Sequence, residues 1–281
     1  MSLPRPGPGG GRDTDPERPL ARVLLCTSGG LFGALVLQRL LASPAVEVVG
    51  IIKSTRVLHP RQGWLRDVLA LLHRSGLHYA LYLGCATGGA ELVGRWRGLP
   101  PVDVAARTRG LPILATRDLN STGGRDFVAR CGPDLLLSAF FNQRIGEPMC
   151  SVPPLGAVNI HPSRLPDFRG VDPVFYARLR GAHPLGVSVH RIGPEIDTGA
   201  LLAQAEVAID PAASLLAATA QLFDRGVALF LGCLPALQAG DPGRPQPRGG
   251  SYDSWPTPAE VRAFVRSGNR LLRMDDLRRV W

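Results

Sequence analysis

The chain alternates short, mostly apolar stretches with longer stretches that carry apolar residues at helical spacing. Mostly apolar runs at 22–26, 46–52 and 134–139 are typical of strands that a parallel sheet buries on both faces. A strand, a glycine-rich turn, a helix over 34–41 and a second strand make a βαβ unit near the start. The pattern therefore predicts an α/β protein with a Rossmann-like, open, mostly parallel twisted sheet and helices on both faces.

The rest of the chain continues this alternation. Short apolar or alternating segments predict further strands at 112–115, 157–160, 186–190 and 206–209. Helices are predicted at 124–131, 174–179 and 214–238, and a Thr-Pro-Ala-Glu capping box at 257–260 opens one more helix. Pro162 cannot donate a ladder hydrogen bond, so the strand that begins at 157 should end before it.

The two ends of the chain differ in composition from the middle. Residues 1–20 are rich in proline, glycine, arginine and aspartate and lack an apolar core, which predicts a disordered tail and no signal peptide. Residues 240–256 are rich in proline and glycine, which favours a linker. We therefore expect one main domain over 21–239, followed at 240–281 by a linker and a short helical tail.

Residues 54–110 are predicted to form a helical insertion in the main domain. Trp64–Leu72 has apolar residues at helical spacing, and 78–90 carries no charge. Both stretches are shorter than the roughly 20 apolar residues that a membrane span needs, so no span is expected. A buried helix pair is the simplest interpretation, and a lid or a membrane-surface contact is the alternative.

Charge is unevenly distributed along the chain. The 32 basic and 23 acidic residues give a net charge of +9, and nine basic but only three acidic residues lie within 53–110. A basic surface there could attract an anionic substrate, or it could be a solvated face. The five cysteines include no Cys-x-x-Cys pair, which predicts reduced thiols in a cytoplasm and argues against a metal site.

The glycine-rich turn at 27–33 is a candidate anion site. A dinucleotide-binding turn needs Gly-x-Gly-x-x-Gly and an acidic residue after the second strand, but Ser28 and Lys53 stand at those places. Ser28, Gly29 and Gly30 precede a helix whose N-terminus can hold an anion, such as a phosphate of a substrate. Alternatively, these glycines serve only the turn and its packing.

Three polar side chains are predicted to meet at one edge of the sheet. Asn159 and His161 are two residues apart, which places both on the same face of a strand. They lie at its carboxyl end, where open α/β sheets bind ligands. Asp197 lies in a turn after the strand at 186–190 and brings a carboxylate to the same edge. Each residue alone could be structural, but their joint spacing favours a catalytic site.

These residues belong to a pattern that resembles the folate-dependent formyltransferases. The pattern is Asn159-x-His161-Pro-Ser-x-Leu-Pro, then Arg169-Gly170, then Asp197-Thr-Gly. It covers 111–210 well and 22–52 in general plan, and it is specific as a whole although each piece alone is weak. The resemblance implies the formyltransferase fold and a catalytic domain over 21–239 that takes its formyl group from 10-formyltetrahydrofolate.

The resemblance implies a role for each polar side chain in the attack of an amine on the formyl carbon. Asn159 would donate to the tetrahedral oxyanion, a contact worth about 3–4 kcal/mol in such sites. His161 would donate to the same oxygen and shuttle a proton, with its pKa raised by a nearby carboxylate. Asp197 would supply that carboxylate and take up the amine proton, directly or through water.

The resemblance also implies where the two substrates bind. The folate pocket would be lined by Leu136, Phe140, Phe141, Ile145, Ile192 and Gly193, although the phenylalanines could instead be core residues. Arg169 belongs to the motif, and Arg164 stands where many members have leucine. Apart from the resemblance, the charges of these two arginines and the helix N-terminus at Ser28, Gly29 and Gly30 could contact an acidic or phosphorylated acceptor.

The expected function is formyl transfer to a primary amine of a small acceptor, with phosphorylated and nucleotide-linked amines among the options. Folate and this amine would be the partners. Alternatives are a hydrolase that releases formate from the same donor, a methionyl-tRNA formyltransferase-like enzyme, or a non-catalytic folate- or nucleotide-binding module. Only about 40 residues follow the main domain, too few for the second barrel of tRNA-acting members, so nucleic acid is disfavoured but not excluded. The sequence indicates no oligomeric state.

Overall fold

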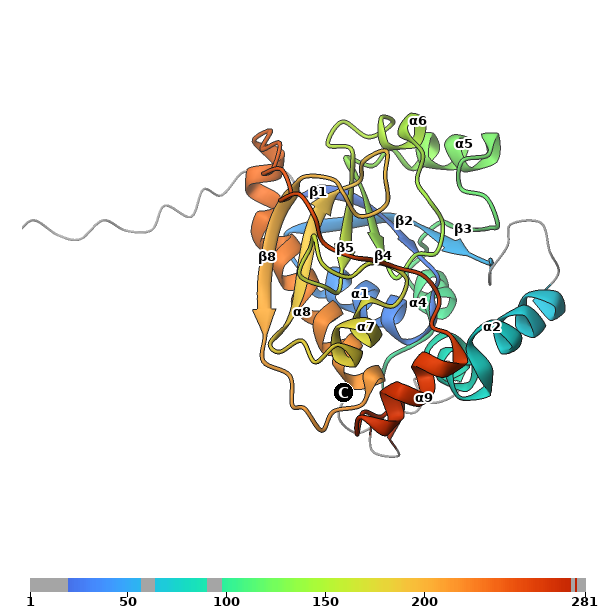
Figure 1. Ribbon diagram of the computed structural model, residues 1–281. Coiled ribbons are helices and arrows are strands. Elements are labelled where there is room, and N and C mark those ends of the chain that lie inside the picture. The colour runs from blue at the N-terminus through green and yellow to red at the C-terminus, as the bar shows by residue number, and fades with distance from the viewer. Residues whose placement is uncertain (1–19, 57–63, 90–97, 274–275, 277–281) are drawn as a thin grey trace, which may run out of the picture.

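The fold is built on one seven-stranded sheet. The structure, a computed structural model, describes residues 20–56, 64–89, 98–273 and 276. The strand order is β3-β2-β1-β4-β5-β7-β8 (Figure 1). The first five strands in this order run parallel, whereas β7 and β8 are antiparallel to their neighbours. The expected α/β architecture with a mostly parallel sheet is confirmed.

Most predicted strands are present with small shifts at their ends. The strands of the main sheet are β1 Ala21–Thr27, β2 Val46–Ser54, β3 Ile113–Thr116, β4 Leu135–Ala139, β5 Ala157–His161, β7 Leu185–Arg191 and β8 Leu201–Val207. The strand predicted at 206–209 is wrong in its bounds. Most residues of β8, an edge strand, are only partly buried, so its sequence lacks a clear alternation of apolar and polar positions.

Helices cover both faces of the sheet. Alternate residues of β1 point to opposite sides: Val23 and Leu25 belong to one apolar cluster, and Leu24 and Cys26 to the other. The first cluster includes α1 (Gly30–Ala42) and α8 (Leu215–Gln238), and the second includes α5 (Thr122–Cys131) and α6 (Glu147–Cys150). Figure 1 shows α5 and α6 together at one side of the sheet, away from α8.

The longest of these helices, α8, is strongly apolar. Among the residues that the structure describes, α8 alone is long and apolar enough to cross a membrane by length and composition. However, 61% of its 18-residue apolar stretch is buried inside the protein. Its N-cap is Ser214, whose hydroxyl accepts from the amide of Ala217. Gly226 lies where a Cβ would collide with Ile160 of β5. The helix therefore packs closely on the sheet, as its amphipathic sequence predicts.

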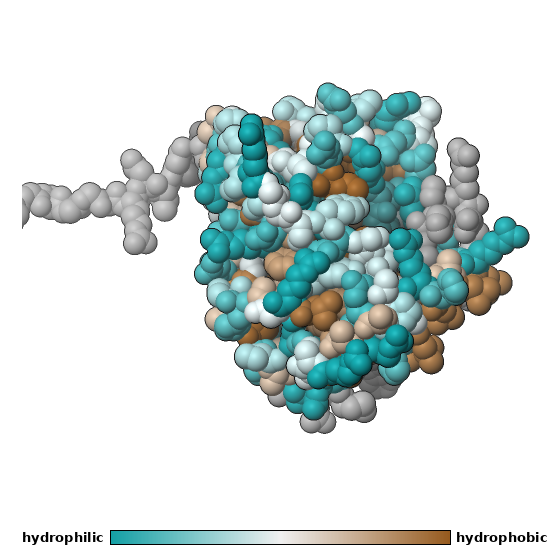
Figure 2. All heavy atoms as spheres, viewed as in Figure 1, coloured by the Kyte–Doolittle hydropathy of each residue, from teal (hydrophilic) through white to brown (hydrophobic). Residues whose placement is uncertain are grey.

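The insertion is helical where it is described, but it is buried on one side only. Helix α2 (Trp64–Gly84) is interrupted at Gly76, whose φ of 81° is left-handed, and a π-helical turn η1 (Cys85–Gly89) and α4 (Val102–Thr108) follow. Tyr79 and Tyr82 are buried, whereas four leucines are more than half exposed: Leu65, Leu69, Leu77 and Leu81. Figure 2 shows hydrophobic side chains at this edge of the molecule. The expectation of a buried helix pair therefore holds for one side of α2 and is wrong for the other.

A partly buried polar contact joins the insertion to the segment after β5. Tyr79 of α2 donates to a carboxylate oxygen of Asp172 at 2.8 Å, and Asp172 is the N-cap of α7 (Pro173–Leu179) with a left-handed φ of 45°. Burial raises the pKa of Asp172 to about 6, although its hydrogen bonds from Tyr79 and the Phe175 amide act in the opposite direction. The folded protein therefore binds a proton here more tightly than the unfolded chain does.

Asp172 should make the stability of the protein fall as pH rises from about 4 to about 6. Its protonated form is the one that the fold favours, so this contribution is complete below the unfolded pKa of 3.8 and is lost through the folded pKa of about 6. The change amounts to about 2 kcal/mol, reduced from the full linkage value because the residue keeps some contact with solvent. Urea unfolding of the parent and of Asp172→Asn at pH 4 and pH 7 measures it.

The Asp172→Asn variant is a suitable comparison because asparagine also tolerates left-handed backbone and caps helices. The free energy of unfolding of the parent minus that of Asp172→Asn should be smaller at pH 7 than at pH 4. An equal difference at pH 4 and pH 7 would contradict the assignment.

The chain after α8 returns to the body of the protein. Residues 169–170 (β6) pair in parallel with Tyr252–Asp253 (β9) in a small second sheet. Helix α9 (Pro258–Arg266) begins with the predicted capping box, which both side chains complete. Its Phe264 is fully buried and stacks on Phe175 of α7 with ring centroids 4.6 Å apart. The stretch expected to be a linker thus makes sheet contacts, whereas the expected tail at 1–20 lies almost wholly outside the described residues.

Candidate active site

Asn159 and His161 lie at the carboxyl end of β5, on one face of the strand. β5 ends at His161, directly before Pro162, as predicted. Asn159 is opposite His190 of the antiparallel strand β7, and His161 is opposite Ser188. Asp197 comes from the loop that joins β7 to β8. The structure therefore brings the three predicted polar residues together, and it adds a second histidine.

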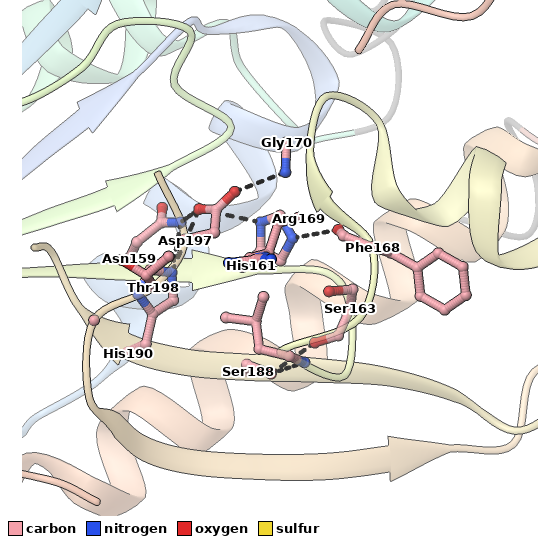
Figure 3. Close-up of polar contacts among 12 residues, drawn as sticks. Asn159, His161, Ser163, Phe168, Arg169, Gly170, Ser188, His190, Asp197 and Thr198 are labelled. Atoms are coloured by element: carbon pink, nitrogen blue, oxygen red, sulfur yellow. Dashed lines mark hydrogen bonds and ion pairs between the residues drawn. The ribbon is translucent and has the colours of Figure 1, made fainter. Parts of the chain in front are cut away.

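The carboxylate of Asp197 is the centre of this group (Figure 3). Its Oδ1 atom is 3.7 Å from Nδ1 of His161 and 3.6 Å from Nε2 of His190. The amide of Asn159 donates to the same oxygen over 3.5 Å. Its Oδ2 atom accepts from the backbone amide of Gly170 at 2.9 Å. One carboxylate thus contacts an amide, two imidazoles and a backbone N–H.

The charge state of Asp197 follows from these contacts. Burial by itself would raise its pKa, but the imidazoles of His161 and His190, in their charged forms, and the hydrogen bond from the Gly170 amide outweigh burial. The net pKa of Asp197 lies well below its usual range. This carboxyl group is therefore ionised at neutral pH and is a weak proton acceptor.

His161 has a defined orientation. Its Nε2 lies 2.9 Å from the carbonyl oxygen of Phe168, and because a carbonyl can only accept, Nε2 carries a hydrogen. Nδ1 therefore faces Asp197. Burial lowers the pKa of His161, and the nearby Asp197 only partly offsets it. The sequence led us to expect a raised pKa; the carboxylate acts in that direction, but the loss of hydration is larger.

His190 is the residue that the sequence analysis gave no role. Its Nδ1 lies 2.8 Å from the Arg191 carbonyl oxygen, and its Nε2 lies 3.2 Å from Nδ2 of Asn159. Nδ1 therefore carries the hydrogen, and Nε2 accepts from the Asn159 amide. The sequence feature that could have pointed to His190 was its place in the predicted strand at 186–190, where it shares a face with Ser188. The sequence does not give the register between neighbouring strands, so this feature does not show which residues His190 contacts.

The residues predicted for the folate pocket fall into two groups. Leu136, Phe141, Ile145 and Ile192 belong to the apolar cluster on the α5 side of the sheet, with Phe141 and Ile192 only partly buried. Phe140 packs in the opposite cluster, with its ring 4.9 Å from that of Phe32 in an edge-to-face contact. Gly193 lies in the loop before Asp197, against the backbone of Gly199.

The residues predicted for the acceptor have partners within the chain. Arg164 forms an ion pair with Glu206 at 2.7 Å, and Arg169 donates to the carbonyl oxygens of Gly249 and Ser251. The hydroxyl of Ser28 accepts from the Asn142 amide. Gly29 and Gly30 both have left-handed φ, and a Cβ on Gly30 would collide with the backbone of Ala86 in η1. The packing role of this turn thus has a direct structural basis.

A cavity of about 350 Å³ lies next to Arg164. It is lined by Arg164, Leu165, Pro166, Asp167, Leu201, Gln204, Arg244, Pro245 and Pro247. Arg164 is the one predicted site residue among them. Within the described part of the chain, no group of three or more His, Cys, Asp or Glu residues is arranged to hold a metal ion.

Comparisons with known proteins identify the family of this chain. The formyl transferase family matches residues 90–232. A methionyl-tRNA formyltransferase from Chloroflexus aggregans is 37% identical over 161 residues, which make up 57% of this chain and 52% of that protein. The chain spans about half the length of the curated relatives that it matches.

Two solved structures share the fold. Glycinamide ribonucleotide transformylase 1 from Symbiobacterium toebii has a TM-score of 0.54 at 17% identity, covering 79% of this chain and 89% of that one. The sugar 3N-formyl transferase WlaRD, solved in the presence of dTDP and 5-N-formyl-THF, has a TM-score of 0.52 at 15% identity, covering 84% and 70%. At these identities the likeness concerns the fold alone.

Proposed function

This chain belongs to the formyl transferase family, and from that premise we propose that it transfers the formyl group of 10-formyltetrahydrofolate to a primary amine of a small acceptor. The observation that carries the proposal is the convergence of Asn159, His161 and His190 on the carboxylate of Asp197. Amide, imidazole and carboxylate are the groups that acyl transfer from an amide-like donor needs.

The donor fits the described residues. Phe141 and Ile192 are among the partly buried members of their apolar cluster, so apolar surface remains for a pterin ring. The sugar 3N-formyl transferase WlaRD was crystallised in the presence of 5-N-formyl-THF, a close chemical relative of the proposed donor. Bound beside these residues, 10-formyltetrahydrofolate supplies the formyl carbon that the amine attacks.

His161 is the proton acceptor in the proposed mechanism. With Nε2 hydrogen-bonded to Phe168 and the pKa of the ring lowered by burial, its Nδ1 carries a free lone pair at neutral pH. Nδ1 takes the proton that the amine loses and returns it to N10 of the donor. The formyl C–N10 bond and one amine N–H bond break, and a new C–N bond and an N10–H bond form.

Asp197 and Asn159 stabilise the charges that develop. Asp197 stays ionised because of its low pKa and stabilises the imidazolium of His161 between the two proton transfers. This assignment replaces the expectation that Asp197 itself takes the amine proton. Asn159 donates to the oxyanion; its 3.5 Å contact with Asp197 is long enough for a substrate oxygen to replace it.

The location proposed for this reaction is the cytoplasm. All five cysteines are free in the structure, in agreement with a reducing compartment. Two of them, Cys26 and Cys131, are buried, and burial raises the pKa of both thiols, so they remain unreactive.

Folate binding should raise the melting temperature of the protein, whereas NAD should not. A ligand that binds only the folded state stabilises it by about 2.7 kcal/mol at a hundred times its dissociation constant. Differential scanning fluorimetry with 5-formyltetrahydrofolate, tetrahydrofolate and NAD measures the effect. Stabilisation by NAD but not by either folate would contradict the proposal and favour a dinucleotide at the 27–33 turn.

Formyl transfer itself is tested with a labelled donor. The purified protein is incubated with 10-[14C-formyl]tetrahydrofolate and pools of amine metabolites, and labelled amides are separated from labelled formate. We expect a labelled amide in at least one pool of small amines. Formate release that needs no amine would instead identify a hydrolase, and labelling of methionyl-tRNA alone would identify a tRNA-acting enzyme.

A further inference from the structure

The segment 244–253 crosses the candidate active site after the chain leaves α8 (Figure 1). Arg244 exchanges two backbone hydrogen bonds with Leu201, the first residue of β8, at 2.8 and 2.9 Å. This pairing fixes the segment next to the loop that carries Asp197. Gln246 follows two residues later, on the same side of an extended chain as Arg244.

Gln246 connects this segment to the backbone of the Asp197 turn. Its Nε2 donates to the carbonyl oxygen of Asp197 at 2.9 Å and to that of Gly199 at 2.8 Å. One side-chain amide therefore satisfies two carbonyls of the same three-residue turn. A flipped amide would place an oxygen against both carbonyls, so the contacts determine its orientation.

The turn that Gln246 holds has little stability of its own. Asp197 has a left-handed φ of 56°, a conformation that costs energy for a residue other than glycine. Gly199 is packed so closely on β7 that a Cβ would collide with the Arg191 carbonyl. The turn therefore depends on contacts from other parts of the chain, and Gln246 supplies two of them.

The same segment also holds the backbone on the other side of the site. The Phe168 amide donates to the Ser251 hydroxyl, and the Arg169 amide donates to the Ser251 carbonyl, both at 2.9 Å. The Phe168 carbonyl accepts from His161, and the Gly170 amide donates to Asp197. Residues 244–253 thus contact both pieces of backbone that orient the imidazole and the carboxylate.

We propose that Gln246 is a positioning residue, which holds the Asp197–Gly199 turn so that the Asp197 carboxylate keeps its contact with His161. The consequence for catalysis rests on the proposed formyl transfer, but the positioning itself does not. The remaining oxygen of Gln246, Oε1, is buried without a partner among the described residues. Within that part of the chain, the two contacts with the turn are thus what offsets the cost of burying this amide.

The titration of His161 tests this positioning without any substrate. The groups that face His161 are the Asp197 carboxylate, the Phe168 carbonyl and the His190 ring. Asp197 raises the pKa of His161, so a loosened turn should lower that pKa by about 0.5 unit or more. The measurement is the pH dependence of the imidazole nitrogen shifts in 15N-histidine-labelled protein, with the His161 signals identified by their loss in His161→Asn.

Gln246→Met is the test variant and Gln204→Met is its matched control. Methionine keeps the length of the side chain and removes the amide. Gln204 also donates from one Nε2 to two acceptors, the Leu165 carbonyl at 2.8 Å and the Ser188 hydroxyl at 2.9 Å, but its hydrogen bonds do not reach the Asp197 turn. We expect the His161 pKa to fall in Gln246→Met and to stay at the parent value in Gln204→Met.

Kinetics give a second reading once the acceptor is known. We expect Gln246→Met to lower kcat about tenfold, as for the loss of two buried hydrogen bonds, with the KM for the folate within about twofold of the parent. Gln246→Ala, which leaves room for water at the two carbonyls, serves if the methionine variant does not fold. An unchanged His161 pKa in folded Gln246→Met or Gln246→Ala, or an equal change in Gln204→Met, would overturn the proposal. If the parent transfers no formyl group, the titration still decides the positioning.

Discussion

Replacing His161 with alanine is expected to lower kcat for formyl transfer about 1,000-fold, the size of effect that general acid–base groups have in acyl transfer. His161 is the one imidazole of the site whose Nε2 is held by a backbone carbonyl while its Nδ1 faces the Asp197 carboxylate. Without this ring, the site lacks the imidazole that accepts the amine proton and returns it to N10 of the donor. The measurement is steady-state transfer from 10-formyltetrahydrofolate at saturating acceptor.

The control for this prediction is another histidine. His73 lies on α2 and is exposed, so His73→Ala should keep kcat within about threefold of the parent, as surface substitutions away from a site usually do. Circular dichroism and a thermal melt establish that both variants are folded. A folded His161→Ala protein with a parent-like kcat would show that the ring only fills the core, and the proton acceptor would have to be sought elsewhere.

Replacing Phe264 with alanine is expected to lower the free energy of unfolding by about 3–5 kcal/mol, the usual cost of removing a buried phenylalanine side chain. Phe264 is fully buried and stacks on Phe175, which is itself fully buried and lies at 5.9 Å, edge to face, from Tyr79 of the insertion. Alanine would leave a cavity where α9, α7 and α2 meet. Urea unfolding at equilibrium, followed by circular dichroism, measures the loss.

The neighbouring residue provides the matched comparison. Val265 lies on the same helix and is 51% exposed, so Val265→Ala should change the free energy of unfolding by less than about 0.5 kcal/mol. Similar values for the two variants would mean that α9 does not contribute to the core. In that case the residues after 240 would behave as the appended linker and tail that their composition suggests.

Much of the fold was predictable because its signals are local. The runs at 22–26 and 134–139 became β1 and β4 in the middle of the sheet, where burial on both faces favours mostly apolar sequence. The capping box at Thr257 also formed as predicted, since its two hydrogen bonds involve residues only three positions apart. The edge strand β8 and the exposed side of α2 were predicted wrongly. There, neighbours distant in sequence decide which apolar residues are covered.

The candidate site divides in the same way. The sequence alone determined that Asn159 and His161 share a face at the end of a strand, because the spacing of two residues and Pro162 are sufficient for that inference. It also brought Asp197 into the group through the motif. It did not determine the pKa of His161, since burial and the carboxylate act in opposite directions and only the packed structure sets their balance. His190 joins the site through the register of β5 with β7, and Gln246 through a segment 49 positions after Asp197. Tertiary structure alone decided these two contacts, because no local pattern encodes which distant side chain will meet a given turn.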